Sequence, residues 1–169
     1  MDDDLAEFCR REHRRLVAAL DLVCGSLPMA EDLAQETLAR ICKDWKRVGV
    51  MDAPGAYAHR VALNLANSAF RRRQAERRAD VRLRAEPTSY APPDSATALS
   101  VRESLQRLRP DQRRVLVLRY FLGYSIGETA DLLRMPVGTV KTHAYRGLTS
   151  LRDDLGITVT AEDLAVDHA

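Results

Sequence analysis

The sequence predicts an all-α protein made of two small helical domains that are joined by a flexible linker. Apolar residues recur at spacings of three and four through most of the 169 residues, and no run alternates apolar and polar residues as a strand does. Residues 86–95 contain three prolines and few apolar residues, which is typical of an extended linker. We therefore predict four segments: a first helical domain, the linker, a second helical domain and an acidic tail, over residues 1–80, 81–97, 98–156 and 157–169.

Three helices are expected in the first domain. The first occupies about residues 5–24, and the second runs from near Pro28 to a stop by Gly49. The third begins at Pro54, because the missing N–H of proline would have no partner at the first position of a helix. It continues into the arginine run at residues 71–73.

Helical periodicity returns after the linker. A leucine-bearing helix is expected before Pro110, which begins the next helix, and that helix ends before Gly123. Its inward-facing residues are predicted to be Val115, Leu116, Leu118 and Phe121. Because a Pro-containing linker does not fix a distance, we expect the two domains to move independently in the free chain.

The strongest local pattern lies between Ser125 and Leu151. Ser125 stands three residues before Glu128, which is the spacing of a capping box at a helix start. A short helix, the turn at residues 134–136 and a last helix from Val137 then give the layout of a helix-turn-helix. Its second helix would expose hydrogen-bonding and cationic side chains suited to base edges and phosphates: Thr139, Lys141, Thr142, Tyr145 and Arg146. A plain helical hairpin is the alternative.

Charge is concentrated in two basic segments. Residues 60–84 contain eight arginines and two acids, residues 98–152 contain ten Lys/Arg and four acids, and residues 153–169 contain five acids and no Lys or Arg. Two basic segments indicate two surfaces for a polyanion. From charge alone, ordinary solvated helix faces remain equally compatible with this pattern.

Other function classes find little support in the sequence. No nucleophile elbow, phosphate-binding glycine loop or metalloprotease histidine pair is present, so we predict no enzyme activity, no small-molecule substrate and no cofactor. Cys9 and His13 share a helical face, but two ligands do not complete a metal site, and none is predicted. Three cysteines without paired spacing, an acidic N-terminus and no long apolar run predict a soluble cytoplasmic protein without membrane insertion.

The second domain resembles a known family. Residues 108–120, 125–130 and 137–141 are similar to region 4 of the sigma-70 family factors of RNA polymerase, and in particular to the extracytoplasmic-function (ECF) group. In that family this domain reads the −35 promoter element. The resemblance therefore implies −35 contacts for a set of residues on the last helix: Thr139, Lys141, Thr142, His143, Tyr145 and Arg146.

The first domain resembles region 2 of the same family. Residues 30–38 are similar to the helix that docks on the clamp helices of the β′ subunit, which implies core polymerase binding by Asp32, Gln35 and Glu36. Residues 54–73 are similar to the segment that reads and melts the −10 element, and residues 46–53 correspond to the loop that forms the pocket for a flipped base. The −10 contacts implied in this way fall on Val48, Tyr57, Arg60, Asn64, Arg71, Arg72 and Arg73.

The resemblance implies a promoter-specificity subunit similar to the actinobacterial SigE-like branch. Its partners would be promoter DNA, core RNA polymerase through the β′ clamp helices and the β flap, and an anti-sigma factor. Two alternatives stay open at this point. A helix-turn-helix transcription regulator with an N-terminal helical sensor or dimerisation module would share the C-terminal pattern, and an RNA-binding or scaffold protein would share the arginine clusters.

Overall fold

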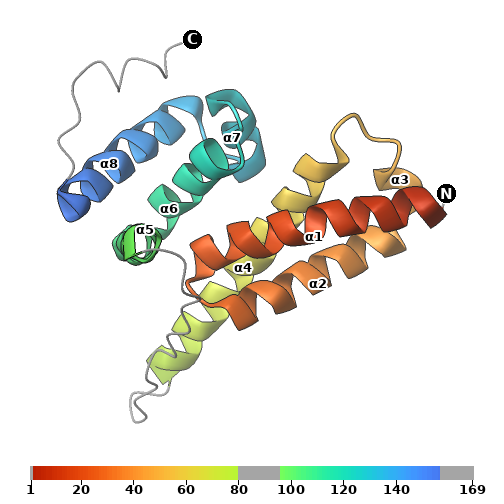
Figure 1. Cartoon of the computed structure of the whole chain (residues 1–169), viewed down its shortest axis with the longest axis horizontal. Coiled ribbons are helices and arrows are strands. Elements are labelled where there is room, and N and C mark those ends of the chain that lie inside the picture. Colours follow the sequence, from red (N-terminus) through yellow and green to blue (C-terminus); the bar gives the residue numbers. More distant parts are fainter. Residues whose placement is uncertain (1, 80–95, 157–169) are drawn as a thin grey trace.

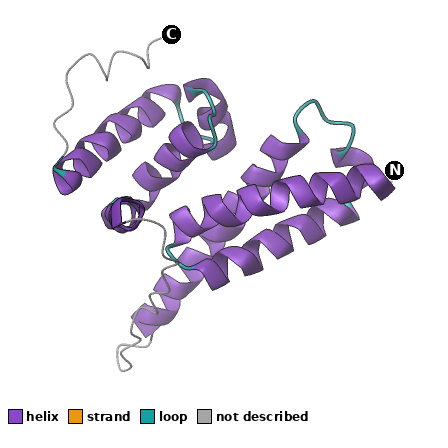
Figure 2. Cartoon of the chain, in the orientation of Figure 1, coloured by secondary structure: helices purple, strands orange, loops and turns teal. Residues whose placement is uncertain are grey.

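The computed structural model describes residues 2–79 and 96–156, and within these ranges it contains helices and loops but no strand (Figures 1 and 2). The N-terminal domain holds α1 (Asp2–Cys24), α2 (Leu27–Lys43), α3 (Trp45–Val48) and α4 (Pro54–Ala79). The C-terminal domain holds α5 (Ala96–Arg107), α6 (Pro110–Leu116), the π-helix η1 (Val117–Phe121), α7 (Ile126–Leu133) and α8 (Val137–Leu155).

The N-terminal domain is a bundle in which α1, α2 and α4 pack against one another (Figure 1). The helix expected from residue 28 to residue 49 is divided at Asp44, which leaves helical geometry with φ −112° and ψ 18°. The face that α4 buries is formed largely by alanines, and Ala58, Ala62 and Ala66 are almost fully buried. Because alanine side chains are small, α4 can approach α1 and α2 closely.

The C-terminal domain has the helix arrangement expected from the capping-box pattern. Val115 of α6, Ala130 of α7 and Val140 and Ala144 of α8 form one buried cluster. The π-helix η1 is a difference from the sequence prediction. The extra residue in its turn rotates the chain, so that Phe121, predicted to face inward, is 49% exposed while Leu118 is fully buried.

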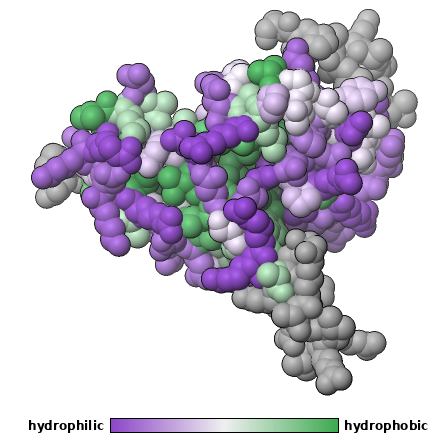
Figure 3. Space-filling model, turned by 180° about the vertical axis from the view of Figure 1, so that it is seen from behind, coloured by the Kyte–Doolittle hydropathy of each residue, from purple (hydrophilic) through white to green (hydrophobic). Residues whose placement is uncertain are grey.

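The two domains pack on each other, which differs from the independent domains that the linker predicts. Leu16 and Leu20 of α1 and Ala62 of α4 lie in the same buried cluster as Val117 and Leu118 of η1. The hydrophobic core therefore continues from one domain into the other. Figure 3 shows hydrophilic residues over most of one face of the molecule, with hydrophobic atoms gathered toward its middle.

The predicted linker and tail fall mostly outside the described residues. Residues 80–95 and 157–169 are not described, and α5 already begins at Ala96, inside the range predicted for the linker. Among the helices within residues 2–79 and 96–156, none combines the length and the apolar character required to span a bilayer.

Candidate nucleic-acid interface

The helix-turn-helix is held by a capping box and a tight turn. The backbone N–H of Ser125 donates to Glu128 Oε2 at 2.7 Å, and the backbone N–H of Glu128 donates to Ser125 Oγ at 3.1 Å. The hydrogen bond from the Ser125 N–H lowers the pKa of the Glu128 carboxyl below its ordinary value. The turn is made by Arg134 in the left-handed region, with φ 53°, and by a hydrogen bond from the Met135 N–H to the Ala130 carbonyl at 3.0 Å. This turn sets the direction in which α8 leaves α7.

The outer face of α8 carries most of the side chains predicted to contact the −35 element. Lys141, Thr142, Tyr145 and Arg146 are exposed, and Tyr145 retains 61% of its accessible surface. The Thr142 hydroxyl donates to the Gly138 carbonyl at 2.9 Å. The other two predicted residues, Thr139 and His143, are half-buried.

His143 differs from its exposed neighbours because its Nδ1 atom is buried and has no hydrogen-bond partner. Val140 and Ala144, on either side of it along the helix, are buried in the domain core. His143 therefore lies at the edge of the exposed face, where it can present one side of its ring.

In the N-terminal domain, the Tyr57 ring lies beside two arginines, and we call these three side chains the Tyr57 cluster. The guanidinium carbons of Arg47 and Arg60 lie 5.2 Å and 5.3 Å from the centre of the Tyr57 ring, and Arg47 Nη2 also donates to the Tyr57 hydroxyl at 2.9 Å. Arg47 is held in turn by Asp44, and its Nε donates to Asp44 Oδ2 at 2.8 Å. This hydrogen bond lowers the pKa of Asp44. Two cations and an aromatic ring are thus placed together at the start of α4.

Arg47 is a residue that the sequence prediction missed. It lies on α3, within residues 46–53 that the resemblance implied to form the base pocket, but only Val48 of that range was named as a contact. The fold brings Arg47 to the Tyr57 ring, ten residues further along the chain. A cationic residue in a short helix gives no periodic signal by itself. The signal that could have found it is the Asp44–Arg47 spacing of three residues, which suits an ion pair on a helix.

The prediction of Val48 as a DNA contact is corrected by its burial. Val48 is fully buried and packs with Phe8, Ile41 and Ala58. Val50, two residues further along the chain, is 83% exposed, because α3 ends at Val48 and the loop that follows lies at the surface.

The remaining predicted −10 residues lie along α4. Asn64 is exposed and Arg60 is half-buried, four residues apart on the helix. The arginine run Arg71, Arg72 and Arg73 is exposed near the far end of the described part of α4. The structure therefore places one cation, Arg60, in the first part of α4 and three more, at residues 71–73, near the end of its described part.

The residues predicted to bind core polymerase share the exposed face of α2. Asp32, Gln35 and Glu36 are all exposed, and Glu36 accepts a hydrogen bond from Arg40 Nε at 2.8 Å. The Glu36 carboxylate is thus paired with Arg40, four residues further along the same helix. Asp32 and Gln35 leave an acidic and polar patch beside that pair.

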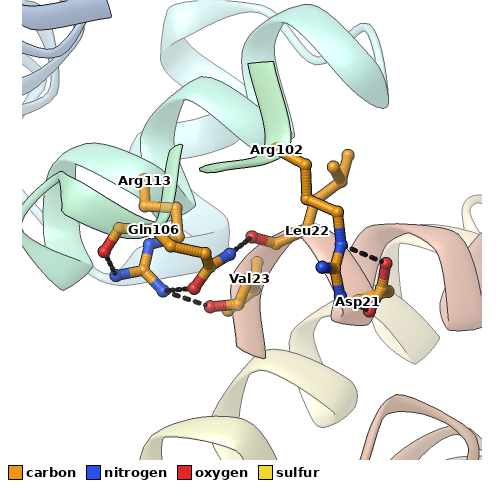
Figure 4. A network of polar contacts seen from close by, with 6 residues as sticks. All are labelled: Asp21, Leu22, Val23, Arg102, Gln106 and Arg113. Carbon is orange, nitrogen blue, oxygen red and sulfur yellow. Dashed lines mark hydrogen bonds and ion pairs between the residues drawn. The ribbon is translucent and has the colours of Figure 1, made fainter. Parts of the chain in front are cut away.

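Polar contacts join the end of α1 to the C-terminal domain (Figure 4). The last turn of α1 contains no basic residue. Its terminal carbonyls instead accept hydrogen bonds from side chains of the C-terminal domain. Gln106 Nε2 donates to the Leu22 carbonyl and Arg113 Nη1 donates to the Val23 carbonyl, each at 2.8 Å. Arg102 adds a two-bond ion pair with Asp21. We call this set of contacts the interdomain clasp, formed by Asp21, Leu22, Val23, Arg102, Gln106 and Arg113.

A second polar contact between the domains is centred on His59 of α4. His59 Nδ1 lies 2.6 Å from the Tyr124 hydroxyl, and His59 Nε2 lies 3.7 Å from Glu12 Oε2. His59 and Glu12 are each only 2% exposed. Burial lowers the pKa of His59 to about 4, against an opposing effect of the Glu12 carboxylate. The imidazole is therefore neutral near pH 7.

Both domains match known protein families. Residues 8–76 match the family described as Sigma-70 region 2, and residues 98–151 match the family described as Sigma-70, region 4. The chain is 35% identical over 152 residues to the RNA polymerase sigma-E factor of Streptomyces coelicolor, covering 90% of this chain and 86% of that protein. It is 28% identical over 145 residues to the ECF RNA polymerase sigma factor SigW of Bacillus subtilis, covering 78% of each.

A solved structure has the same fold. The sigma factor RpoE from Bartonella quintana, described in complex with the anti-sigma factor NepR, matches with a TM-score of 0.83 at 22% identity, covering 92% of this chain and 99% of that one. The matches to regions 2 and 4 define a protein of the transcription-initiation class. The chain belongs to the sigma-70 family of RNA polymerase sigma factors, within the ECF group.

Family membership decides between the readings that the sequence left open. An ECF sigma factor binds core RNA polymerase and directs promoter recognition and transcription initiation, and the family is a class of initiation factors rather than of enzymes. The N-terminal half matches region 2 over residues 8–76, so the alternative of a sensor or dimerisation module in that half is dropped. The RNA-binding or scaffold alternative is dropped for the same reason.

Proposed function

We propose that the exposed face of α8 reads the −35 element, that α4 and the Tyr57 cluster read and capture the −10 strand, and that the patch on α2 docks on core polymerase. The observation that carries this proposal is the exposure of Lys141, Tyr145 and Arg146 on a helix that follows a capped helix and a tight turn. Cations and hydrogen-bonding groups on such a helix can reach the base edges in a major groove.

The −10 role rests on the chemistry of single-strand capture. The Tyr57 ring supplies a flat surface on which a base can stack. The two guanidiniums beside it supply positive charge for the neighbouring phosphates. Arg47 joins Tyr57 and Arg60 in this proposal, whereas buried Val48 supports the loop from inside. Asn64 and the exposed arginines 71–73 extend the same surface along α4.

The core-docking role rests on the position of the α2 patch. Asp32, Gln35 and Glu36 lie on an exposed face that takes no part in the interdomain clasp. We propose that this patch meets the β′ clamp helices and that the C-terminal domain meets the β flap. In this account the protein works in the cytoplasm, catalyses no reaction by itself and needs no cofactor.

An anti-sigma partner is part of the proposal. Support comes from the fold shared with the Bartonella quintana sigma factor that is described in complex with NepR. Such a partner would compete for surfaces that core polymerase uses.

A charge reversal on α2 tests the docking proposal. Asp32→Arg in the full chain should reduce retention of the protein on immobilised core polymerase by at least about tenfold, because it places a cation where the docking surface requires an acid. Glu7→Arg, at an exposed acid of α1, is the matched control and should bind as the unaltered chain does. Equal retention of both variants would remove α2 from the docking surface.

A further inference from the structure

Two cysteines that the proposed function does not use lie side by side between α1 and α2. Cys9 Sγ and Cys42 Sγ are 3.8 Å apart, although the residues are 33 positions apart in the sequence. Cys9 is partly buried, whereas Cys42 in the last turn of α2 is exposed. We propose that this pair is a modification site, at which a low-molecular-weight disulfide oxidises the two thiols to a reversible intramolecular disulfide.

The packing of the two helices already brings the two sulfur atoms near each other. The residues immediately before the two cysteines, Phe8 and Ile41, are buried in the same cluster, which fixes α1 against α2 at this level. A disulfide requires the two sulfur atoms at about 2.05 Å. Rotation about the Cα–Cβ bonds can close the remaining distance while the backbones stay in place.

The different exposure of the two thiols sets the order of the steps. Cys42 is accessible, so its thiolate attacks one sulfur of the small disulfide, forms a mixed disulfide and releases the first small thiol. Cys9 then attacks Cys42 Sγ, its proton passes to the leaving sulfur, and the second small thiol is released. In total, two protein thiols are oxidised and one small disulfide is reduced to two thiols.

Cys9 is suited to the second step rather than to the first. Burial and the neighbouring Cys42 raise the pKa of Cys9 to about 11, so Cys9 is protonated at neutral pH and reacts slowly with an oxidant in solution. Attack on a sulfur that is already held beside it is intramolecular, which compensates for the small thiolate fraction.

The third cysteine provides a matched control in the same helix. Cys24, the last residue of α1, packs against the cluster that joins the two domains. Burial raises its pKa to about 12. We therefore expect Cys24 to remain a free thiol under conditions that oxidise the pair.

The cross-link would fasten α1 at the end opposite to the interdomain clasp (Figure 1). The clasp holds the last turn of α1, whereas Cys9 lies nearer to the beginning of the same helix. Because a disulfide restricts the unfolded chain, the oxidised protein should melt at a higher temperature than the reduced protein.

Thiol mapping of the full chain tests the proposal. After native incubation with oxidised glutathione, alkylation and mass spectrometry should find one free thiol instead of three, together with a Cys9–Cys42 linked peptide that dithiothreitol removes. Cys24→Ser should form the same link, and its Tm should rise on oxidation as that of the unaltered chain does. Cys9→Ser should keep glutathione on Cys42, and Cys42→Ser should form neither the link nor an adduct.

Three outcomes would overturn the proposal. The first is a stable glutathione adduct on Cys42 of the unaltered chain with Cys9 still free. The second is a disulfide that links two chains through Cys42. The third is a link that includes Cys24, because it would mean that the packing of α1 and α2 does not select the pair.

Discussion

Arg102 on α5 donates two hydrogen bonds to the carboxylate of Asp21 on α1, from Nε at 3.0 Å and from Nη2 at 2.7 Å. The two side chains are 16% and 18% exposed, so water screens the pair only partly. The contact spans 81 residues of sequence and joins region 4 to region 2. It is the ion pair of the interdomain clasp, which holds the two domains together in the free chain.

Removing this ion pair should loosen the two domains. Arg102→Ala leaves the partly buried Asp21 carboxylate without its donor, which should cost about 1–3 kcal/mol of unfolding free energy. Chemical denaturation gives this change, and small-angle scattering should show a larger radius of gyration. Arg107→Ala is the control, because Arg107 pairs with Asp154 inside the C-terminal domain in an exposed position. Equal effects of the two variants would contradict a role for the clasp.

Gly25 should be sensitive to a single added methyl group. Its φ is +70°, and an added Cβ would lie 2.5 Å from the Oε1 atom of Gln106, which belongs to the clasp. Gly156 has a similar φ of +63° and no atom within 4 Å of the same position. Gly25→Ala should therefore lower stability by more than Gly156→Ala, whose cost is the backbone term of about 1–2 kcal/mol. Thermal melts of both variants give the comparison, and equal losses would mean that Gln106 moves away freely.

Stability should fall in mildly acidic solution because of His59. Its pKa is about 4 in the folded chain and about 6.5 in the unfolded chain, so the unfolded state binds more protons between these values. The unfolding free energy should therefore decrease as the pH falls from about 6.5 to about 4, by up to about 3 kcal/mol. His59→Gln should flatten this part of the profile in denaturation measured at several pH values. The same slope in the variant would assign the titration to other groups.

The interface between the domains could not be predicted from the sequence. Apolar spacings of three and four and the Ser125–Glu128 pattern predicted helices and their ends, because these depend on neighbours three or four residues apart. The Asp21–Arg102 pair depends on a contact between residues 81 positions apart, for which no local pattern exists. The same limit applies to Cys9 and Cys42.

Only part of the candidate site could be predicted, because some of its side chains are positioned by contacts between residues far apart in the sequence. Exposed positions on α8 followed from helical periodicity, and Lys141 and Arg146 lie on the outer face as expected. Val48 was placed by analogy with a loop, and only the packing of α1, α2 and α4 around it shows that it is buried. Arg47 was missed because its role depends on the Tyr57 ring that it contacts.

Substitutions on α8 should reduce recognition of the −35 element. Lys141→Ala or Arg146→Ala should weaken initiation by about 1–3 kcal/mol if the side chain reaches a base, without changing core binding. A phosphate contact would instead lower binding to all promoters alike and reduce its dependence on salt. Arg152→Ala, in the last turn of the same helix, is the control. Unchanged promoter binding by both variants would show that another face of α8 meets DNA.

The Tyr57 cluster should affect strand opening more than duplex binding. Tyr57→Ala removes the ring beside Arg47 and Arg60, so loss of stacking should lower open-complex formation by about 1–3 kcal/mol. Tyr57→Phe removes only the hydroxyl that accepts from Arg47 and should retain most of the activity. Permanganate footprinting of the −10 region measures opening. Equal losses in the two variants would make the hydroxyl, rather than the ring, the important group.

Promoter opening by the reconstituted holoenzyme tests the central claim most directly. The protein is mixed with core RNA polymerase and a promoter library, and the DNA retained in heparin-resistant open complexes is sequenced. The account predicts enrichment of a shared pair of elements near −35 and −10, with the first lost in Arg146→Ala and the second in Tyr57→Ala. Failure to bind core polymerase, or retention of DNA without any shared element, would contradict it.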